Sequence, residues 1–479
     1  MLCAPTAGGH ADDDKDYTLK RPKKCKKTHK YVRKSVYLHI NTSEKVENMK
    51  RNAINYLEKW KKSKDRKPLI IRGVRQVGKT WLMIEFGRIH YRNVAYINFE
   101  SALSLKRVFS ADFDIQRIIT AFEIETGVKI EKNNTLIILD EIQEAERGVT
   151  VLKYFYEEAP QYHVMAAGSL LGVALHQQTS FPVGKVDFMD LQPMGFTEFL
   201  EAIGQSKLAG LLYNREWDLI KAFKERFVNL LKHYYFTGGM PEAVLEYKAS
   251  NDFNRIRTIQ KSILRGYEQD FSKHAPVSVI PRINMLWNSV PAQLAKENKK
   301  FIYGAIRKGA RAKDFELALN WLCNSGVLYK VHRIKKPGMP LKAYEDFNVF
   351  KLFIFDVGLL GAMSELSAKT LIEGNRIFEE FKGALTEQYV LQQLRLKYAS
   401  DIYYWSAERS SGEIDFIVQD EEDIIPIEVK AEENLKAKSL KSFIKKYPHT
   451  KPVRISMSDY REESWMVNLP LYAVESGLR

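Results

Sequence analysis

Hydrophobic and polar positions follow two different periods along the chain, and the changes between them predict four regions. From Met49 to about residue 210, an amphipathic helix is followed by short β-branched runs that alternate with helical patterns. The runs predicted to be strands are residues 68–72, 94–99, 135–139 and 163–167. Strands that alternate with helices predict a parallel sheet covered by helices, and therefore an α/β fold for residues 49–210.

Residues 211–370 have a mostly helical pattern, interrupted by two predicted strands at 327–334 and 350–355. One helix ends near residue 324 and carries an apolar stripe at helical spacing, formed by Phe315, Ala318, Leu319, Leu322 and Cys323. The tip of the hairpin that follows is basic and contains Lys335, Lys336 and Lys342. A helix followed by a hairpin predicts a winged-helix-like region whose tip would suit phosphate contacts. Basic tips are also common for solubility alone, so both interpretations stay open.

The last region, residues 371–479, returns to short strands between helices. Its predicted order is helix 376–396, strands 402–406, 413–418 and 424–430, a helix ending near 446, and strand 453–455. The first 48 residues, by contrast, show little apolar periodicity and combine an acidic cluster with a basic run. We therefore expect residues 1–48 to be a disordered basic extension.

Composition places the 479-residue chain among globular proteins, with 45% hydrophobic and 28% charged residues. No run approaches the ~18 uncharged apolar residues that would cross a bilayer, and the first residues lack the apolar core of a signal peptide. The three cysteines lie far apart, without the spacing of metal ligands. These features predict a cytoplasmic protein with no membrane association, and they leave a homo-oligomer open.

The charge of the chain favours an anionic partner. Its net charge is +15, from 74 Lys and Arg against 59 Asp and Glu. Nine of the basic residues lie between Lys20 and Lys34, with no acid among them. Composition does not distinguish nucleic acid from a nucleotide or a lipid surface. Such a run is most often a solvated arm, so nucleic acid is only one candidate partner.

The strongest chemical signal is GVRQVGKT, which follows the complete pattern G-x-x-x-x-G-K-T between a predicted strand and a helix. The predicted ATP-binding residues are Gly73, Val74, Arg75, Gln76, Val77, Gly78, Lys79 and Thr80. The glycines let the loop turn tightly and aim its N–H groups at phosphate oxygens. Lys79 can then reach the β- and γ-phosphates, and Thr80 can ligate Mg²⁺. A purely structural glycine turn is the alternative interpretation.

A second motif supports the phosphate-binding loop. The apolar strand LIIL ends in Asp140 and Glu141, at the strand end where ligands bind in open α/β sheets. We expect Asp140 to hold Mg²⁺ through water and Glu141 to polarise an attacking water, although two acids after a strand can also cap a helix. Ser169, after the strand 163–167, could contact the γ-phosphate or the water, but Gly-Ser is also ordinary turn chemistry.

Several segments share motifs with one known family. They are residues 72–80 (RGVRQVGKT), 136–143 (LIILDEIQ), 167–171 (AGSLL), 191–200 (LQPMGFTEFL), 238–244 (GGMPEAV), 355–360 (FDVGLL) and 381–391 (FKGALTEQYVL). On these segments the chain, from about Met49 onwards, resembles prokaryotic AAA-like ATPases whose C-terminal half is a domain of unknown function. The resemblance implies ATP binding, an AAA-type core, a winged-helix-like middle and a restriction-endonuclease-like end. Where members of that family usually carry Gly-Arg, this chain has Gly184-Lys185, and a lysine lacks the bidentate fork of arginine.

The C-terminal region offers a second candidate site. Glu428 and Lys430 are two residues apart, so they face the same side of their predicted strand. Pairing of Val418 with Ile425 in the hairpin would place Asp415 opposite Glu428. The bare spacing of these residues is expected about once per chain from composition, so their placement on adjacent strands carries the prediction.

The chemistry predicted for this second site is Mg²⁺-dependent cleavage of a phosphodiester. Glu387 on the preceding helix would join Asp415 and Glu428 as a metal ligand. Lys430 would orient a water or stabilise the transition state. A domain of this kind can also persist as a binding module without cleavage.

Two classes of function therefore stay open. The first is an ATP-hydrolysing enzyme that acts on nucleic acid, with a metal-dependent nuclease at its C-terminal end. The second is an ATP-switched interaction or DNA-binding protein whose C-terminal domain does not cleave. A metal held by Glu387, Asp415 and Glu428 would favour the first class, and a structural salt bridge from Lys430 would favour the second.

Overall fold

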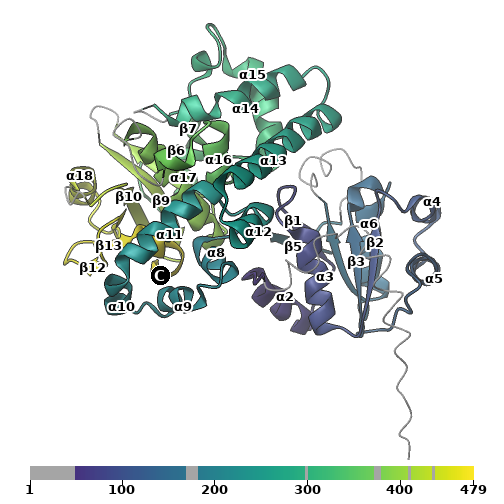
Figure 1. The fold of residues 1–479 in the computed structure, drawn as a ribbon. Helices are drawn as coiled ribbons and strands as arrows, with labels where there is room; N and C mark the ends of the chain where they lie inside the picture. The colour runs from purple at the N-terminus through teal and green to yellow at the C-terminus, as the bar shows by residue number, and fades with distance from the viewer. Residues whose placement is uncertain are drawn as a thin grey trace, which may run out of the picture. The chain divides into compact units, whose positions relative to one another are not determined.

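The computed structural model describes residues 49–168, 182–296, 300–371, 379–407, 412–433 and 437–478. The predicted extension (residues 1–48) and Ser169 lie outside the described residues. The described part of the chain is α/β, as the sequence predicts (Figure 1). No helix in it is long and apolar enough to cross a membrane.

The first part of the fold is a parallel sheet with helices. In chain order its elements are α2 (Ala53–Lys62), β1 (Leu69–Arg72), α3 (Lys79–His90), β2 (Asn93–Asn98), α4 (Leu103–Ala111), α5 (Ile115–Thr126), β3 (Thr135–Asp140), η1 (Ile142–Glu144), α6 (Gly148–Glu158), β4 (His163–Ala167) and β5 (Asp187–Asp190). Among the described residues the sheet has five strands, all parallel, in the order β2-β3-β4-β1-β5. The four strands predicted from the sequence are confirmed, and β5, a short strand at one edge, was not predicted.

Alternation of side chains explains why helices cover both faces of this sheet. Along β3, Leu136 and Ile138 pack in one core with Phe86 of α3, whereas Ile137 and Leu139 pack in a second core. That second core also contains buried residues of α4, α5 and α6. A parallel sheet needs both faces buried, and β3 is apolar at every position between Thr135 and Asp140. The phosphate-binding loop after β1 and the acids at the end of β3 consequently lie at the same edge of the sheet.

The rest of the chain contains a helical part and a second sheet. The helical part consists of α8 (Phe196–Ala202), α9 (Ser206–Asn214), α10 (Trp217–Ala222), α11 (Lys224–Thr237), α12 (Pro241–Ser250), α13 (Phe253–His274), α14 (Ile280–Leu294), η2 (Tyr303–Ala305), α15 (Ala312–Asn324), β6 (Leu328–Ile334), η3 (Leu341–Tyr344), β7 (Glu345–Ile354) and α16 (Val357–Met363). It is followed by α17 (Glu379–Lys397), β8 (Tyr403–Ser406), β9 (Glu413–Asp420), β10 (Asp423–Val429), α18 (Lys438–Lys446), β11 (Val453–Ser456), β12 (Arg461–Glu462), β13 (Val467–Pro470), η6 (Leu471–Ala473) and α19 (Val474–Gly477).

The second sheet crosses the predicted boundary at residue 370. Within the described residues it has eight strands, in the order β12-β13-β11-β10-β9-β8-β6-β7. The predicted helix and hairpin are present as α15, β6 and β7, and β6 and β7 are antiparallel. However, β6 also pairs in parallel with β8. The hairpin is therefore one end of the sheet that the C-terminal strands complete.

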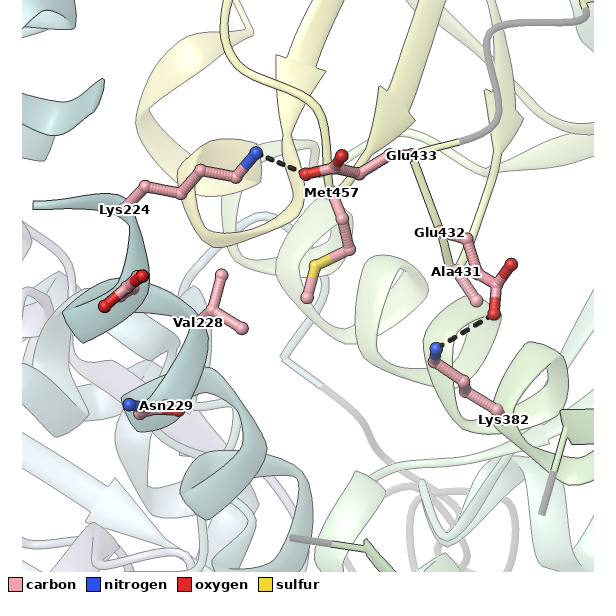
Figure 2. Close-up of a pocket in the computed structure, with 9 residues that line it drawn as sticks. Lys224, Val228, Asn229, Lys382, Ala431, Glu432, Glu433 and Met457 are labelled. Atoms are coloured by element: carbon pink, nitrogen blue, oxygen red, sulfur yellow. Dashed lines mark hydrogen bonds and ion pairs between the residues drawn. The ribbon is translucent and has the colours of Figure 1, made fainter. Parts of the chain in front are cut away.

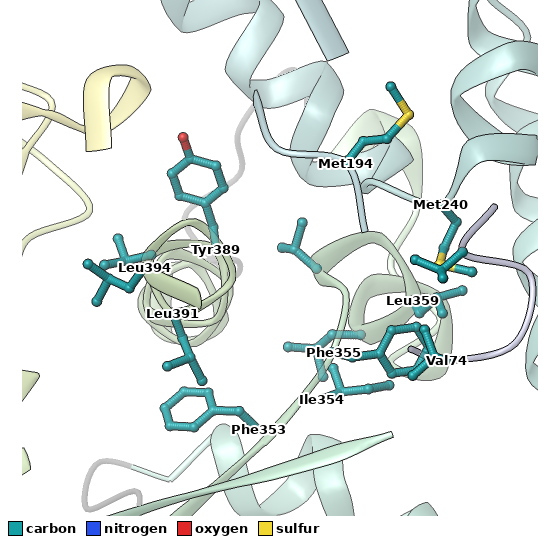
Figure 3. Packing of buried hydrophobic residues seen from close by; sticks show 14 of the residues in the cluster. Val74, Met194, Met240, Phe353, Ile354, Phe355, Leu359, Tyr389, Leu391 and Leu394 are labelled. Atoms are coloured by element: carbon teal, nitrogen blue, oxygen red, sulfur yellow. The ribbon is translucent and has the colours of Figure 1, made fainter. Parts of the chain in front are cut away.

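Three of the motif segments meet in the core of the molecule. The Met194 N–H donates to the Gly239 carbonyl at 2.8 Å, and the Gly239 N–H donates to the Asp356 carboxylate at 2.6 Å. Asp356 is buried and also accepts from the Leu359 N–H at 3.0 Å, which caps α16. Figure 3 shows Met194, Leu359 and their apolar neighbours in this core, with Val74 of the phosphate-binding loop beside them. Residues far apart in sequence thus form one core next to the predicted nucleotide site.

Candidate functional site

The loop between β1 and α3 has the backbone that a phosphate-binding loop requires. Gly73 and Gly78 have φ angles of 144° and 96°, in the region that favours glycine. A Cβ on Gly73 would lie 2.4 Å from the carbonyl oxygen of Leu191, which follows β5. The close approach of that chain, as well as the turn, therefore requires glycine at position 73.

Lys79 and Thr80 begin α3 and point to the edge of the sheet where β3 ends. Lys79 is only 7% exposed, and its ammonium group donates to the carbonyls of Gly73 and Val74 at 2.8 and 2.9 Å. Burial lowers the pKa of Lys79 to about 8, against the opposing effect of nearby carboxylates, so the ammonium form still prevails at pH 7. The Thr80 hydroxyl donates to the Asp140 carboxylate at 2.6 Å.

The two acids at the end of β3, Asp140 and Glu141, have different surroundings. Asp140 is buried and accepts hydrogen bonds from Thr80 and from the Tyr96 hydroxyl, the latter at 3.0 Å. Burial raises the pKa of Asp140, and these hydrogen bonds oppose the rise. Glu141 is partly exposed, with a left-handed φ of 49°, and its carboxylate accepts from the Gln143 side chain at 2.6 Å. Gln143 lies inside the motif LIILDEIQ, but nothing in the sequence assigned it this role.

Arg51, a buried residue that the sequence analysis missed, supports the phosphate-binding loop from outside. It donates to the Val77 carbonyl at 3.0 Å and forms an ion pair with the buried Glu198 at 3.2 Å. A buried arginine needs such a partner, because its charge has lost its water. Arg51 lies two residues before α2, so the start of the fold near Met49 contributes directly to the loop.

A second support for the loop comes from α13. Arg75 forms an ion pair with Asp270, and the Tyr267 hydroxyl donates to the Arg75 carbonyl at 2.6 Å. Neither α13 residue had a signal in the sequence beyond its place in a helical pattern. Lys185, at the position where the resembling family has arginine, forms an ion pair with Glu157 at 3.0 Å.

The predicted C-terminal site residues lie on neighbouring elements, but their carboxylates face two different lysines. Glu428 pairs with Lys430, and Glu387 pairs with Lys351. Val418 pairs with Ile425, as predicted, and this register runs towards Asp415 and Glu428. Glu428 is buried, and its carboxylate forms an ion pair with Lys430 at 3.2 Å. The remaining Glu428 oxygen has no hydrogen-bond partner among the described residues.

The other two predicted ligands face a lysine that the sequence analysis missed. Lys351, on β7, lies 3.5 Å from Glu387 and 2.5 Å from Glu413. Burial raises the pKa of Asp415, and the neighbouring Glu387 raises it further, while Lys351 opposes both effects. Asp415 also accepts a hydrogen bond from the Val429 N–H at 2.7 Å. We call the three acids around Lys351 the acid cluster; they are Glu387, Glu413 and Asp415.

These contacts do not fit a divalent metal ion. Within the described ranges, no three His, Cys, Asp or Glu side chains are arranged to hold a metal. The acid cluster already surrounds an ammonium group, and Glu428 contributes a single open oxygen. Ligation of a metal by Glu387, Asp415 and Glu428 therefore stays a prediction that the geometry disfavours.

A pocket opens beside this region (Figure 2). It lies between α11, the start of α17 and the residues that follow β10. Two ion pairs cross it, Lys224 with Glu433 and Lys382 with Glu432, the second at 3.3 Å. Since each lysine is paired with an acid on the opposite side, the pocket presents no excess of positive charge to a phosphate.

Comparison with known families identifies the first part of the chain. Residues 65–200 match the family model described as an AAA domain. Residues 228–370 and 382–472 match the models of two domains of unknown function, DUF8612 and DUF4143. No curated protein matches the sequence.

Several solved structures have some similarity to the chain. A Walker-type ATPase of Pyrococcus abyssi is 15% identical, with 66% of this chain and 96% of that chain covered and a TM-score of 0.42. The Aeropyrum pernix Orc1 protein in complex with DNA is 11% identical, with 65% and 90% covered and a TM-score of 0.26. The Thermotoga maritima RuvB Holliday junction branch migration motor is 15% identical, with 59% and 90% covered and a TM-score of 0.28. TM-scores this low do not establish a shared fold.

The family match and the geometry agree on the first part of the chain. The matched residues include the phosphate-binding loop with its buried Lys79 and the strand that ends in Asp140. Residues 65–200 thus match an AAA domain and carry a complete phosphate-binding loop.

Proposed function

We propose that this protein binds ATP with Mg²⁺, hydrolyses the ATP, and acts on nucleic acid. The observation that supports hydrolysis most directly is the group formed by Lys79, Thr80 and Asp140 at one edge of the parallel sheet. A buried ammonium group lies on the loop, and a hydroxyl lies 2.6 Å from a carboxylate. These are the groups that phosphoryl transfer requires, because its catalysis consists mainly of positioning and of stabilising charge.

Each side chain has a definite part in this proposal. Lys79 would leave the loop carbonyls and contact the β- and γ-phosphates, while loop N–H groups bind phosphate oxygens. Thr80 and Asp140 are oxygen donors that fit Mg²⁺, which when bound neutralises phosphate charge. Glu141 would orient the attacking water, and Gln143 would hold the Glu141 carboxylate in place.

Exposed basic residues beside the hairpin support action on nucleic acid. Residues 300–313 contain no acid, and the Phe301 N–H donates to the Phe350 carbonyl of β7 at 2.8 Å, so this segment begins next to the hairpin. Its exposed cations are Lys300, Arg307, Lys308, Arg311 and Lys313. At the hairpin tip Lys335 and Lys336 are also exposed. Clustered surface cations of this kind bind phosphate backbones without reading sequence.

Charge reversal in this segment tests the proposed contact with nucleic acid. The double variant Lys308→Glu, Arg311→Glu is expected to weaken binding of duplex DNA at low salt by about 10-fold or more, since phosphate contacts dominate such affinity. The measurement is fluorescence anisotropy with labelled DNA over a range of salt concentrations, together with the ATPase rate with and without DNA. We expect DNA to raise the rate of the wild type.

The control is Lys62→Glu, which changes an exposed lysine of α2 far from this segment in sequence. It should bind DNA as the wild type does. The nucleic-acid part of the proposal fails if the wild type binds no DNA or RNA at low salt and its ATPase rate does not change with either. The ATPase part of the proposal would still stand.

For the C-terminal domain we propose the role of a binding module without cleavage. The Lys430–Glu428 ion pair at 3.2 Å supports this choice, because it engages the lysine that cleavage would need. The acid cluster supports it independently, because its oxygens surround Lys351.

A further inference from the structure

Lys351 occupies an unusual position for a lysine. It interrupts the apolar run VFKLFIF at residues 349–355 on β7, and it is 1% exposed. Lysine is almost never this deeply buried unless its charge is paired. Its side chain passes the ring of Tyr404 on β8, with 5.0 Å from the ammonium nitrogen to the ring centre, and reaches Glu413 on β9.

The charge of Lys351 is maintained by the acids around it. Burial alone would lower the pKa of Lys351, but Glu387, Glu413 and Asp415 outweigh burial and raise it. The ammonium group therefore remains charged across the physiological range. It stands 2.5 Å from Glu413 and 3.5 Å from Glu387, among the oxygens that a metal ion would have to share.

A divalent ion and this ammonium group would compete for the same place. Carboxylate ligands approach Mg²⁺ at about 2.1 Å and Ca²⁺ at about 2.4 Å, so a metal on these oxygens would lie within a few ångströms of a buried positive charge. Like charges at that separation repel strongly where water is scarce. The lysine and a metal therefore exclude each other.

We propose that Lys351 is the resident cation of the acid cluster and takes the place of a divalent metal ion. The cluster then clamps the β6–β7 hairpin to the C-terminal strands. The lysine comes from the region that matches one domain model, residues 228–370, and the acids come from the region that matches another, residues 382–472. This assignment does not depend on ATP hydrolysis, because it concerns the second sheet only.

The first test measures metal binding in the nucleotide-free full-length protein. Mn²⁺ is titrated into the wild type and into Asp415→Asn, and bound ion is counted by electron paramagnetic resonance. Any Mn²⁺ at the phosphate-binding loop is present in both proteins and cancels. We expect the same stoichiometry in both. One Mn²⁺ per chain that is present in the wild type and lost in Asp415→Asn would overturn the proposal.

The second test removes the lysine. Lys351→Met keeps the length of the side chain, leaves the carboxylates without their counter-charge, and is expected to lower Tm by about 5 °C or more. Millimolar Mn²⁺ should restore part of this loss in the variant and leave the wild type unchanged. The control is Lys330→Met on the neighbouring strand β6, whose lysine contacts the exposed Asn320 side chain, and it should change Tm by about 1 °C or less.

The two tests together decide the proposal. A Lys351→Met protein as stable as the wild type would overturn the clamp, and so would stabilisation of the wild type by Mn²⁺ that Asp415→Asn abolishes. If Lys351→Met does not fold, the comparison of the wild type with Asp415→Asn still decides whether a metal binds there.

Discussion

Replacing Lys79 with alanine is expected to weaken ATP binding by about 100-fold or more, because the variant loses a charged hydrogen-bond donor to the phosphates. In the described structure this ammonium group is buried and bonded to two carbonyls of its own loop. When ATP binds, the ammonium group would exchange these carbonyls for the β- and γ-phosphates. The measurement is equilibrium binding of a fluorescent ATP analogue in the presence of Mg²⁺.

The matched control for this substitution is Lys62→Ala, which removes an exposed lysine from α2. It should bind the analogue as the wild type does. Thermal unfolding of both variants shows whether the loop change has damaged the fold. A well-folded Lys79→Ala protein with unchanged affinity would mean that the loop does not bind phosphates.

Replacing Gly239 with alanine is expected to lower the free energy of unfolding by about 3 kcal/mol or more, at the upper end of overpacking effects. A Cβ there would lie 2.1 Å from the Met194 carbonyl oxygen and 2.7 Å from the Met194 nitrogen. Both are backbone atoms, so no rotation of a side chain relieves the overlap. The hydrogen bond from Met194 to Gly239 and the one from Gly239 to Asp356 would both be disturbed.

Gly266 provides the control for this prediction. It lies inside α13, and an added Cβ would meet nothing within 4 Å. Gly266→Ala should therefore leave stability unchanged or raise it by about 0.5–1 kcal/mol, since alanine is the better helix former. Denaturant unfolding of both variants measures the difference, and equal stability of the two proteins would contradict the packing described for this core.

The strands of the first sheet were predictable because both of their faces are buried. A parallel strand is covered on both faces, so its sequence is a continuous apolar run, as at residues 136–139. The phosphate-binding loop was predictable because its chemistry demands fixed residue types at fixed spacing. The pairing of Val418 with Ile425 followed from the short turn between two strands.

The acid cluster was not predictable in the same way, because its members come from distant segments. Asp415 and Glu387 were predicted to face a metal, but sequence spacing does not show which cation fills a cluster of acids. Two weak signals were present. Glu413 lies two residues before Asp415 and so shares its face of the strand, and Lys351 is a single charge in an apolar run.

The residues that hold the phosphate-binding loop in place from outside were not predictable from the sequence, for a related reason. Arg51 and Asp270 each contact it through a single ion pair or hydrogen bond set by tertiary packing. Neither residue belongs to a motif with fixed spacing. Ser169, which was predicted to contact the γ-phosphate or the water, lies outside the described residues and stays a prediction.

The measurement that tests the central claim most directly is steady-state ATP hydrolysis by Glu141→Gln, with ATP binding measured on the same protein. The substitution keeps the size of the side chain and removes the carboxylate that orients water. We expect ATP binding close to that of the wild type. The hydrolysis rate should fall by about 100-fold or more, since 100-fold is the lower end of what a general base contributes. Hydrolysis by Glu141→Gln at the wild-type rate would contradict the role of Glu141, and a wild-type protein that binds no ATP would contradict the account as a whole.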